Sequence, residues 1–353
     1  MTLRIPATEA DHNFRKPIAT WRVARDRLKR GRVFPQSPQT FSLNRSDTVL
    51  TMGSCFARNI EENLVKFGCR VPPLEFKIPQ SEHKGERDNH VLSLFTPPAF
   101  RQTLEWMASI FVRDGKVNEA DCEKLLFRLG NGKVVDLSLS GSLPVTYERF
   151  LERRRELYEL YATAFRAECL LMTPGLVEAW YDLEQSYYTN SAPFYDGKLL
   201  DPVRYELRVL DHDECKADLL AAIDIVRKHN PKVKVLITVS PVPLRTTFTN
   251  QDVLVANTYS KSVLRAACQE IVSERPFVDY FPSFEAVMLS TSGVWERDHR
   301  HINDRLIGEI VKQVVAKYFG AASEETESDE ETSRLSFSRR LRAWLKGSSG
   351  QIL

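Results

Sequence analysis

Short apolar runs alternate with longer amphipathic segments along most of the chain. Four runs have the length and composition of buried strands: 49-VLTM-52, 169-CLLMT-173, 233-VKVLITV-239 and 277-FVDYF-281. Apolar residues recur at helical spacing near 56–67, 98–111, 147–166, 214–228, 252–274 and 302–319. Helices that alternate with buried strands are typical of a parallel sheet covered on both faces. The pattern therefore predicts an α/β fold, a three-layer, doubly wound parallel sheet.

The predicted α/β domain spans residues 46–319, and two parts of the chain before residue 146 depart from its pattern. Residues 1–45 form an N-terminal extension with scattered prolines and basic residues. Residues from about 72 to 145 are less regular and contain the polar stretch 80-QSEHKGERDNH-90. We expect this second part to be an irregular insertion in the domain.

The net charge of the tail, residues 320–353, changes from negative to positive along its length. The stretch 323-SEETESDEETS-333 carries six acidic groups and no basic one, which predicts disorder. The stretch 334-RLSFSRRLRAWLKG-347 carries five basic groups beside leucines and a tryptophan. Two interpretations are open for it: loose pairing with the acidic half, or a short amphipathic helix over 334–346 that makes a weak contact with a membrane surface or a protein.

Composition and charge argue against several classes of protein, including nucleic-acid-binding, membrane-spanning and disulfide-rich proteins. The net charge is +2, so no overall electrostatic argument favours nucleic acid as a partner. The first twenty residues lack the apolar core of a signal peptide, and no run approaches the length of a membrane span. The six cysteines are scattered without a CxxC pair, which favours reduced thiols over disulfides or a zinc ribbon. We expect a cytoplasmic protein.

Candidate chemistry appears where the first predicted strand turns into a helix. The turn 53-GSC-55 puts two nucleophiles, Ser54 and Cys55, at the carboxyl end of a strand. Residues 174–178 and 240–243 follow two other predicted strands in the same way. Open α/β sheets bind their ligands at this edge, so we expect a site there.

A second motif, 298-DHRH-301, precedes the last predicted helix. A carboxylate at Asp298 can hold one imidazole nitrogen of His301 and leave the other free to take a proton from a nucleophile. The pair His299 and His301 could instead bind a metal together with Asp298, but no other cluster supports that reading. We therefore expect a Cys/Ser-His-Asp site that needs no metal or organic cofactor.

The string 53-GSCFA-57 resembles the signature of the GSCFA family, a branch of the SGNH (GDSL-like) hydrolases. The resemblance covers roughly residues 45–319. The superfamily places Gly-Asp-Ser after its first strand, a glycine block after a middle strand, and Asp-x-x-His before its last helix. Here 53-GSC-55, Gly175 in 173-TPGLVEAW-180, and 298-DHRH-301 stand in those positions. The resemblance implies a flavodoxin-like fold of the SGNH-hydrolase type.

The resemblance also implies roles for individual residues. Aligning Gly53 with the superfamily glycine puts Cys55 at the nucleophile position and Ser54 at the aspartate, although Ser54 as nucleophile stays open. The superfamily's oxyanion asparagine has no counterpart in 175-GLVE-178, so backbone N–H groups of Cys55 and Gly175, or the side chain of Asn190, are the expected donors.

The implied activity is hydrolysis or transfer of an ester-linked acyl group, with an acylated small molecule or an acylated carbohydrate or polysaccharide as substrate. In this chemistry His301 deprotonates the nucleophile while Asp298 holds the imidazole. The alternative is a catalytically degenerate protein of the same fold that binds glycan or acts in polysaccharide assembly. The missing asparagine motivates this alternative.

Overall fold

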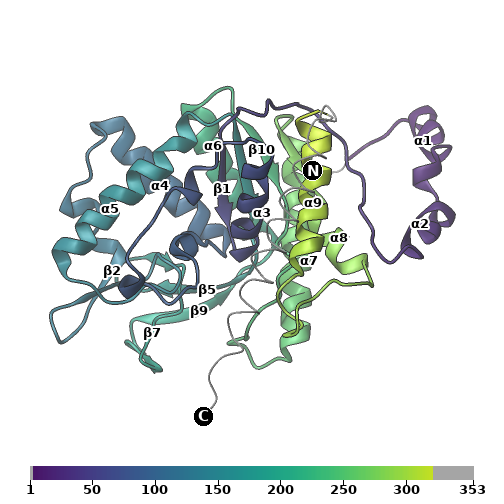
Figure 1. Ribbon diagram of the computed structural model, residues 1–353. Coiled ribbons are helices and arrows are strands. Elements are labelled where there is room, and N and C mark those ends of the chain that lie inside the picture. Colours follow the sequence, from purple (N-terminus) through teal and green to yellow (C-terminus); the bar gives the residue numbers. More distant parts are fainter. Residues whose placement is uncertain (1–2, 321–353) are drawn as a thin grey trace, which may run out of the picture.

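The computed structural model describes residues 3–320 and is built around a central sheet of four parallel strands (Figure 1). The strands are β1 (Val49–Gly53), β4 (Cys169–Thr173), β10 (Lys234–Ile237) and β11 (Val278–Tyr280), hydrogen-bonded in the order β1-β4-β10-β11. All four coincide with the predicted runs to within two residues at either end. The mixed α/β class and the parallel sheet are confirmed.

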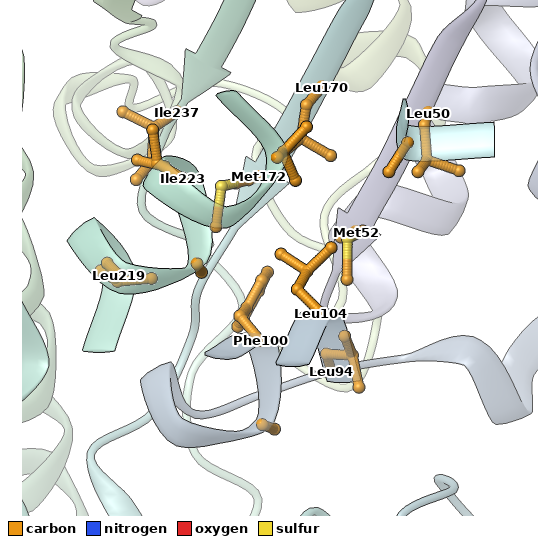
Figure 2. Packing of buried hydrophobic residues seen from close by; sticks show 14 of the residues in the cluster. Leu50, Met52, Leu94, Phe100, Leu104, Leu170, Met172, Leu219, Ile223 and Ile237 are labelled. Atoms are coloured by element: carbon orange, nitrogen blue, oxygen red, sulfur yellow. The ribbon is translucent and has the colours of Figure 1, made fainter. Parts of the chain in front are cut away.

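Helices cover both faces of this sheet because successive strand residues point to opposite sides. Figure 2 shows the face on which side chains of β1, β4 and β10 pack against α4 (Pro97–Arg113) and α6 (His212–His229). Helix α7 (Val253–Glu274) contributes to the same cluster through Leu264 and Cys268. The residues labelled in Figure 2 are Leu50, Met52, Leu94, Phe100, Leu104, Leu170, Met172, Leu219, Ile223 and Ile237. On the other face, α3 (Cys55–Lys66), α8 (Ser283–Leu289) and α9 (Asp304–Tyr318) bury their apolar stripes against the alternate strand residues. The result is three layers.

The stretch expected to be an insertion contributes a helix to the main core. Helix α4 lies inside residues 72–145, yet Phe100, Leu104 and Met107 are fully buried beside α6. The less regular part of that stretch holds the hairpin of β2 (Leu126–Arg128) and β3 (Val134–Asp136), which packs with α5 (Tyr147–Tyr161) in a smaller apolar cluster.

Smaller elements that the hydrophobic pattern did not predict flank the central sheet. An antiparallel sheet has the order β6-β5-β9, and a two-stranded hairpin joins β7 to β8. Their bounds are β5 (Glu178–Asp182), β6 (Tyr187–Thr189), β7 (Phe194–Tyr195), β8 (Lys198–Leu199) and β9 (Tyr205–Val209). The 3-10 helices within residues 3–320 are η1 (Pro17–Ala19), η2 (Pro72–Leu74), η3 (Gln80–Glu82), η4 (Asp88–Leu92), η5 (Glu119–Asp121), η6 (Glu123–Leu125) and η7 (Ala162–Phe165). Strands β5 to β9 are short and partly exposed, so their sequences carry no continuous apolar run that would predict them.

The free edge of β1 is partly covered by a segment just before α4. Ser93 forms a parallel bridge with Gly53, and the N–H of Leu94 donates to the Gly53 carbonyl at 2.8 Å. This segment therefore extends the sheet beyond β1 by one short bridge and brings Phe95 to the same edge as the turn after β1.

The N-terminal extension forms two short helices, α1 (Ala7–Phe14) and α2 (Trp21–Leu28), neither of which contains a buried residue. Figure 1 shows both standing apart from the sheet. The predicted acidic and basic tail lies outside the described residues from 321 onward. None of the helices between residues 3 and 320 combines the length and apolar character that crossing a bilayer requires.

The turn after β1 requires glycine at position 53. Gly53 has a φ of 154°, and a Cβ there would lie 2.9 Å from the Thr173 backbone nitrogen as well as against its side chain. We expect Gly53→Ala to lower the free energy of unfolding by about 2 kcal/mol or more, measured by urea denaturation. Gly130→Ala is the control, because a Cβ at Gly130 meets nothing within 4 Å. Equal stability of the two variants would contradict the close approach at Gly53.

Candidate active site

The turn after β1 gives Ser54 and Cys55 different surroundings. Ser54 is the N-cap of α3 and is only 3% exposed. Its Oγ accepts a hydrogen bond from the Phe56 N–H at 3.2 Å and donates to Ser240 Oγ at 2.8 Å, and its N–H donates to Thr173 Oγ1 at 3.1 Å. Capping satisfies an N–H that the first helical turn cannot pair internally. The Ser54 hydroxyl is thus committed to the turn.

Cys55 is the first residue of α3 and is only partly buried, whereas the other five cysteines are buried. Cys55 and Ser54 both line a cavity. Burial raises the pKa of the Cys55 thiol, and the positive charges of Arg300 and Lys261 oppose that shift. The resting group is therefore a thiol, which needs a base before it can attack.

The cavity has a volume of about 330 Å³ and lies at the carboxyl end of the sheet. Its walls come from the segments after β1, β4 and β10, from the segment before α4, and from the loop before α9. The lining residues are Ser54, Cys55, His90, Phe95, Gly175, Leu176, Ser240, Val242, Pro243, Leu244, Arg245, Thr246, Phe248, Arg300 and His301. The cavity thus collects residues that are far apart in the sequence.

Asp298 and His301 form the pair that their spacing predicts. His301 Nδ1 lies 2.5 Å from Asp298 Oδ2, and Asp298 Oδ1 accepts the backbone N–H groups of Arg300 and His301, each at 3.0 Å. These two N–H groups are the main cause of the lowered pKa of Asp298, and the imidazole of His301 lowers it further. An ionised Asp298 accepts a hydrogen bond from the Nδ1–H group, so in the neutral imidazole Nε2 carries the lone pair.

His301 lines the same cavity as Cys55, but both of its ring nitrogens contact other residues. Its Nε2 lies 3.2 Å from Arg300 Nη1, and half of its side chain is exposed. Between residues 3 and 320, no hydrogen bond joins His301 to Cys55 or Ser54. A direct proton transfer from the thiol to Nε2 therefore requires at least one of these side chains to move.

The residues expected around an oxyanion lie in different places. Gly175 lines the cavity, but its N–H donates to the Phe95 carbonyl at 2.9 Å. Asn190 does not line the cavity: its Nδ2 donates to the Ser93 carbonyl at 2.7 Å and its Oδ1 accepts the Phe95 N–H at 3.1 Å. Asn190 braces the segment before α4. Gly53 lies beneath the turn, where its carbonyl holds Leu94.

Lys261 on α7 is a site residue that sequence reasoning missed. It is 2% exposed, and its Nζ donates to the carbonyls of Gly175 at 2.7 Å and Val242 at 2.8 Å. Burial lowers the pKa of Lys261 to about 7. A signal was present in the sequence, because Lys261 precedes Leu264 and Cys268 at helical spacing and so falls on the buried stripe of α7.

His90, Arg245 and Arg300 also reach the cavity without having been predicted. His90 lies in η4, whereas Arg245 and Arg300 lie in loops, and none of these segments carries a periodic apolar pattern. Across the part of the chain that the structure describes, no group of three or more His, Cys, Asp or Glu side chains is arranged to hold a metal ion, and this includes the His299–His301 stretch.

Comparison with known proteins places this site within a family. The sequence model of the GSCFA family matches residues 48–314, which include β1, the turn at Gly53, the cavity loops and most of α9. No curated protein matches the chain.

The buried thiol predicts an unusual pH profile of alkylation. We expect the rate at which iodoacetamide modifies Cys55 to rise with a midpoint above pH 9.0, because burial disfavours the thiolate. Mass spectrometry of the peptide that contains Cys55 measures the rate, and Cys55→Ala identifies the signal. A midpoint at or below 9.0 would show that the nearby cations outweigh burial.

The lysine predicts a pH dependence of stability. A Lys261 pKa near 7 in the folded state against 10.5 in the unfolded state means that the unfolded chain binds more protons between these values. Stability therefore rises with pH in this window. We expect the unfolding free energy of wild type minus that of Lys261→Met to increase from pH 7 to 8.5, by up to about 1.4 kcal/mol per pH unit, because only wild type carries the titrating amine.

Urea denaturation at several pH values measures this difference. Lys66→Met, which removes an exposed lysine at the end of α3, serves as the control and leaves the pH dependence as it is in wild type. A difference that stays flat or falls with pH would mean that Lys261 keeps an ordinary pKa.

Proposed function

Because this chain belongs to the GSCFA family, we propose that it is an ester hydrolase or acyltransferase of the SGNH type with Cys55 as its nucleophile. The observation that carries the proposal is a single cavity at the carboxyl end of the parallel sheet. Into it open both Cys55, at the N-terminus of α3, and His301, which is paired with Asp298. A nucleophile, a base and a group that orients the base are the minimal set for acyl transfer.

Sheet topology supports the superfamily assignment. If the segment bridged to β1 at Ser93 is counted as a strand, the strands taken in sequence have the spatial order 2-1-3-4-5. This is the order of flavodoxin-like sheets, in which ligands bind at the point where the order reverses. The turns after β1 and β4, which carry Cys55 and Gly175, meet at that point.

The surroundings of the turn favour Cys55 over Ser54 as nucleophile. The Ser54 hydroxyl caps α3 and bonds to Ser240, so its attack would cost the cap. Cys55 faces the cavity and makes neither bond. The positive end of α3 and the charge of Lys261 both stabilise a developing thiolate at this position.

In the proposed mechanism, His301 Nε2 takes the thiol proton while Asp298 holds Nδ1. The Cys55 sulfur then attacks the ester carbonyl, and first-turn backbone N–H groups of α3 face the oxyanion. The tetrahedral intermediate collapses, the C–O bond breaks, and the alcohol leaves with the proton from His301. Water resolves the thioester in a hydrolase, whereas a second hydroxyl resolves it in a transferase. We propose acylated carbohydrate as the substrate class.

The alternative function is binding of a glycan without catalysis. It is favoured by the absence of any hydrogen bond between His301 and Cys55 in the described chain, and by the engagement of the Gly175 N–H with Phe95. In addition, Glu178 of the 175-GLVE-178 stretch accepts hydrogen bonds from Thr247 and Phe248 and offers no donor to a substrate.

Hydrolysis of p-nitrophenyl acetate and butyrate tests the proposal. We expect Cys55→Ala and His301→Ala each to lower kcat/KM at least about 100-fold, because the nucleophile or the general base is lost. Ser54→Ala keeps activity within a fewfold and lowers stability by about 1 kcal/mol through loss of the cap. Cys69→Ala and His12→Ala, which lie outside the cavity, are the matched controls.

Loss of activity in Ser54→Ala and His301→Ala alone would move the nucleophile one residue back. Activity that survives all three site variants would remove the site from the mechanism. A wild-type protein that is inactive on both activated esters, and in which Cys55 is not acylated, would favour the binding function.

A further inference from the structure

Arginines, and no acidic residues, line the cavity. Arg245 and Arg300 line it, Lys261 lies directly beneath its Gly175 and Val242 wall, and none of its lining residues is an aspartate or glutamate. The N-terminus of α3 adds its positive dipole end. A cavity with this lining attracts negative charge.

The two arginines have no carboxylate partner. Across residues 3–320, Arg245 makes no hydrogen bond or ion pair, and Arg300 makes no ion pair. The Nε atom of Arg300 is buried without a hydrogen-bond partner within the same range. Between residues 3 and 320, most partly buried arginines do have acidic partners, such as Arg204 with Asp182 and Arg265 with Glu285. Arg300 is partly buried and departs from this pattern, whereas Arg245 is exposed.

Carboxylates near the cavity do not cancel this charge. Asp298 is held by two backbone N–H groups and by His301, and it does not line the cavity. Glu178 accepts the Thr247 hydroxyl at 2.6 Å and the Phe248 N–H at 2.8 Å from behind the wall. Both are turned to their own partners, which leaves the arginines available to a ligand.

We propose that the ester which enters this cavity carries an anionic group, such as a carboxylate, and that Arg245 and Arg300 bind it. This inference rests on the proposed function and names the substrate class more closely. Guanidinium groups match carboxylate and phosphate oxygens with paired hydrogen bonds. The apolar wall of Phe95, Leu176 and Phe248 then takes the uncharged part of the substrate.

Binding of the anion also releases the base. A guanidinium has no lone pair and can only donate, so Arg300 Nη1 occupies the lone pair of His301 Nε2 at 3.2 Å. While this contact lasts, Nε2 cannot accept the Cys55 proton. An anion that draws Arg300 to itself frees Nε2, so that a charged substrate readies its own general base.

Alkylation of Cys55 by two reagents of nearly equal shape tests the charge without any need for catalysis. Iodoacetate is anionic and iodoacetamide is neutral, and the same thiolate displaces iodide from both, so the thiolate fraction cancels in the ratio of their rates. We expect Arg245→Gln and Arg300→Gln each to lower the iodoacetate-to-iodoacetamide ratio roughly three- to tenfold. Arg305→Gln is the matched control, because Arg305 is exposed on α9 and pairs with Glu309.

Hydrolysis of two esters with five-carbon acyl groups completes the test. Mono-4-nitrophenyl glutarate carries a carboxylate and 4-nitrophenyl valerate does not. We expect wild type to prefer the glutarate ester in kcat/KM, after subtraction of the uncatalysed rate. Both cavity variants lose that preference, whereas the Arg305→Gln control keeps it.

The outcomes separate this inference from the proposed function. Alkylation ratios that are equal in wild type and in all three arginine variants would overturn the anion site, even if both esters are hydrolysed. Ratios that fall in the cavity variants, in a protein that hydrolyses neither ester, would uphold the anion site and overturn the hydrolase.

Discussion

The close approach of strands β1 and β4 at their carboxyl ends is the constraint on which the site depends. Gly53 lies against Thr173 with no room for a side chain, and the Thr173 hydroxyl and carbonyl both receive the N–H of Ser54. Because of this contact the chain leaves the sheet sharply and enters α3 at once. The position of the nucleophile candidate is thereby tied to the contact between the two central strands.

Burial and charge act in opposite directions on the pKa values of Cys55 and Lys261, and burial outweighs charge for both. Burial disfavours both the Cys55 thiolate and the Lys261 ammonium, whereas the attraction between them favours both charged forms. Lys261 also ties the Gly175 segment to the Val242 segment. A change at this lysine therefore acts on the shape of the cavity as well as on its charge.

Hydrophobic periodicity was sufficient to predict the core of the fold. The four central strands are continuous apolar runs, and α3, α6, α7 and α9 carry clear apolar stripes, so their places followed from sequence. The antiparallel strands β5, β6 and β9 were missed because aromatic and charged residues alternate there without a fully buried face. The role of α4 in the core was missed because irregular segments surround it.

The site was predictable where chemistry is local in sequence. The contact of Asp298 with His301 needs only three residues of loop, and Gly53–Cys55 follows a recognisable strand. Arg245 and His90 reach the cavity only through tertiary packing, and Lys261 reaches the backbone of its wall in the same way. The role expected for Asn190 could not have been judged beforehand, because its bonds to Ser93 and Phe95 join segments about ninety-five residues apart.

The cavity walls come from separate loops, each attached to its own strand or helix end, and this bears on how such a protein can diversify. The loop at 242–248 and the loop at 298–301 can change in length or composition without touching the contact between Gly53 and Thr173. Selection can thus alter which molecule is accepted while the attacking group stays in place. Related chains would then share the turn yet differ in their ligands.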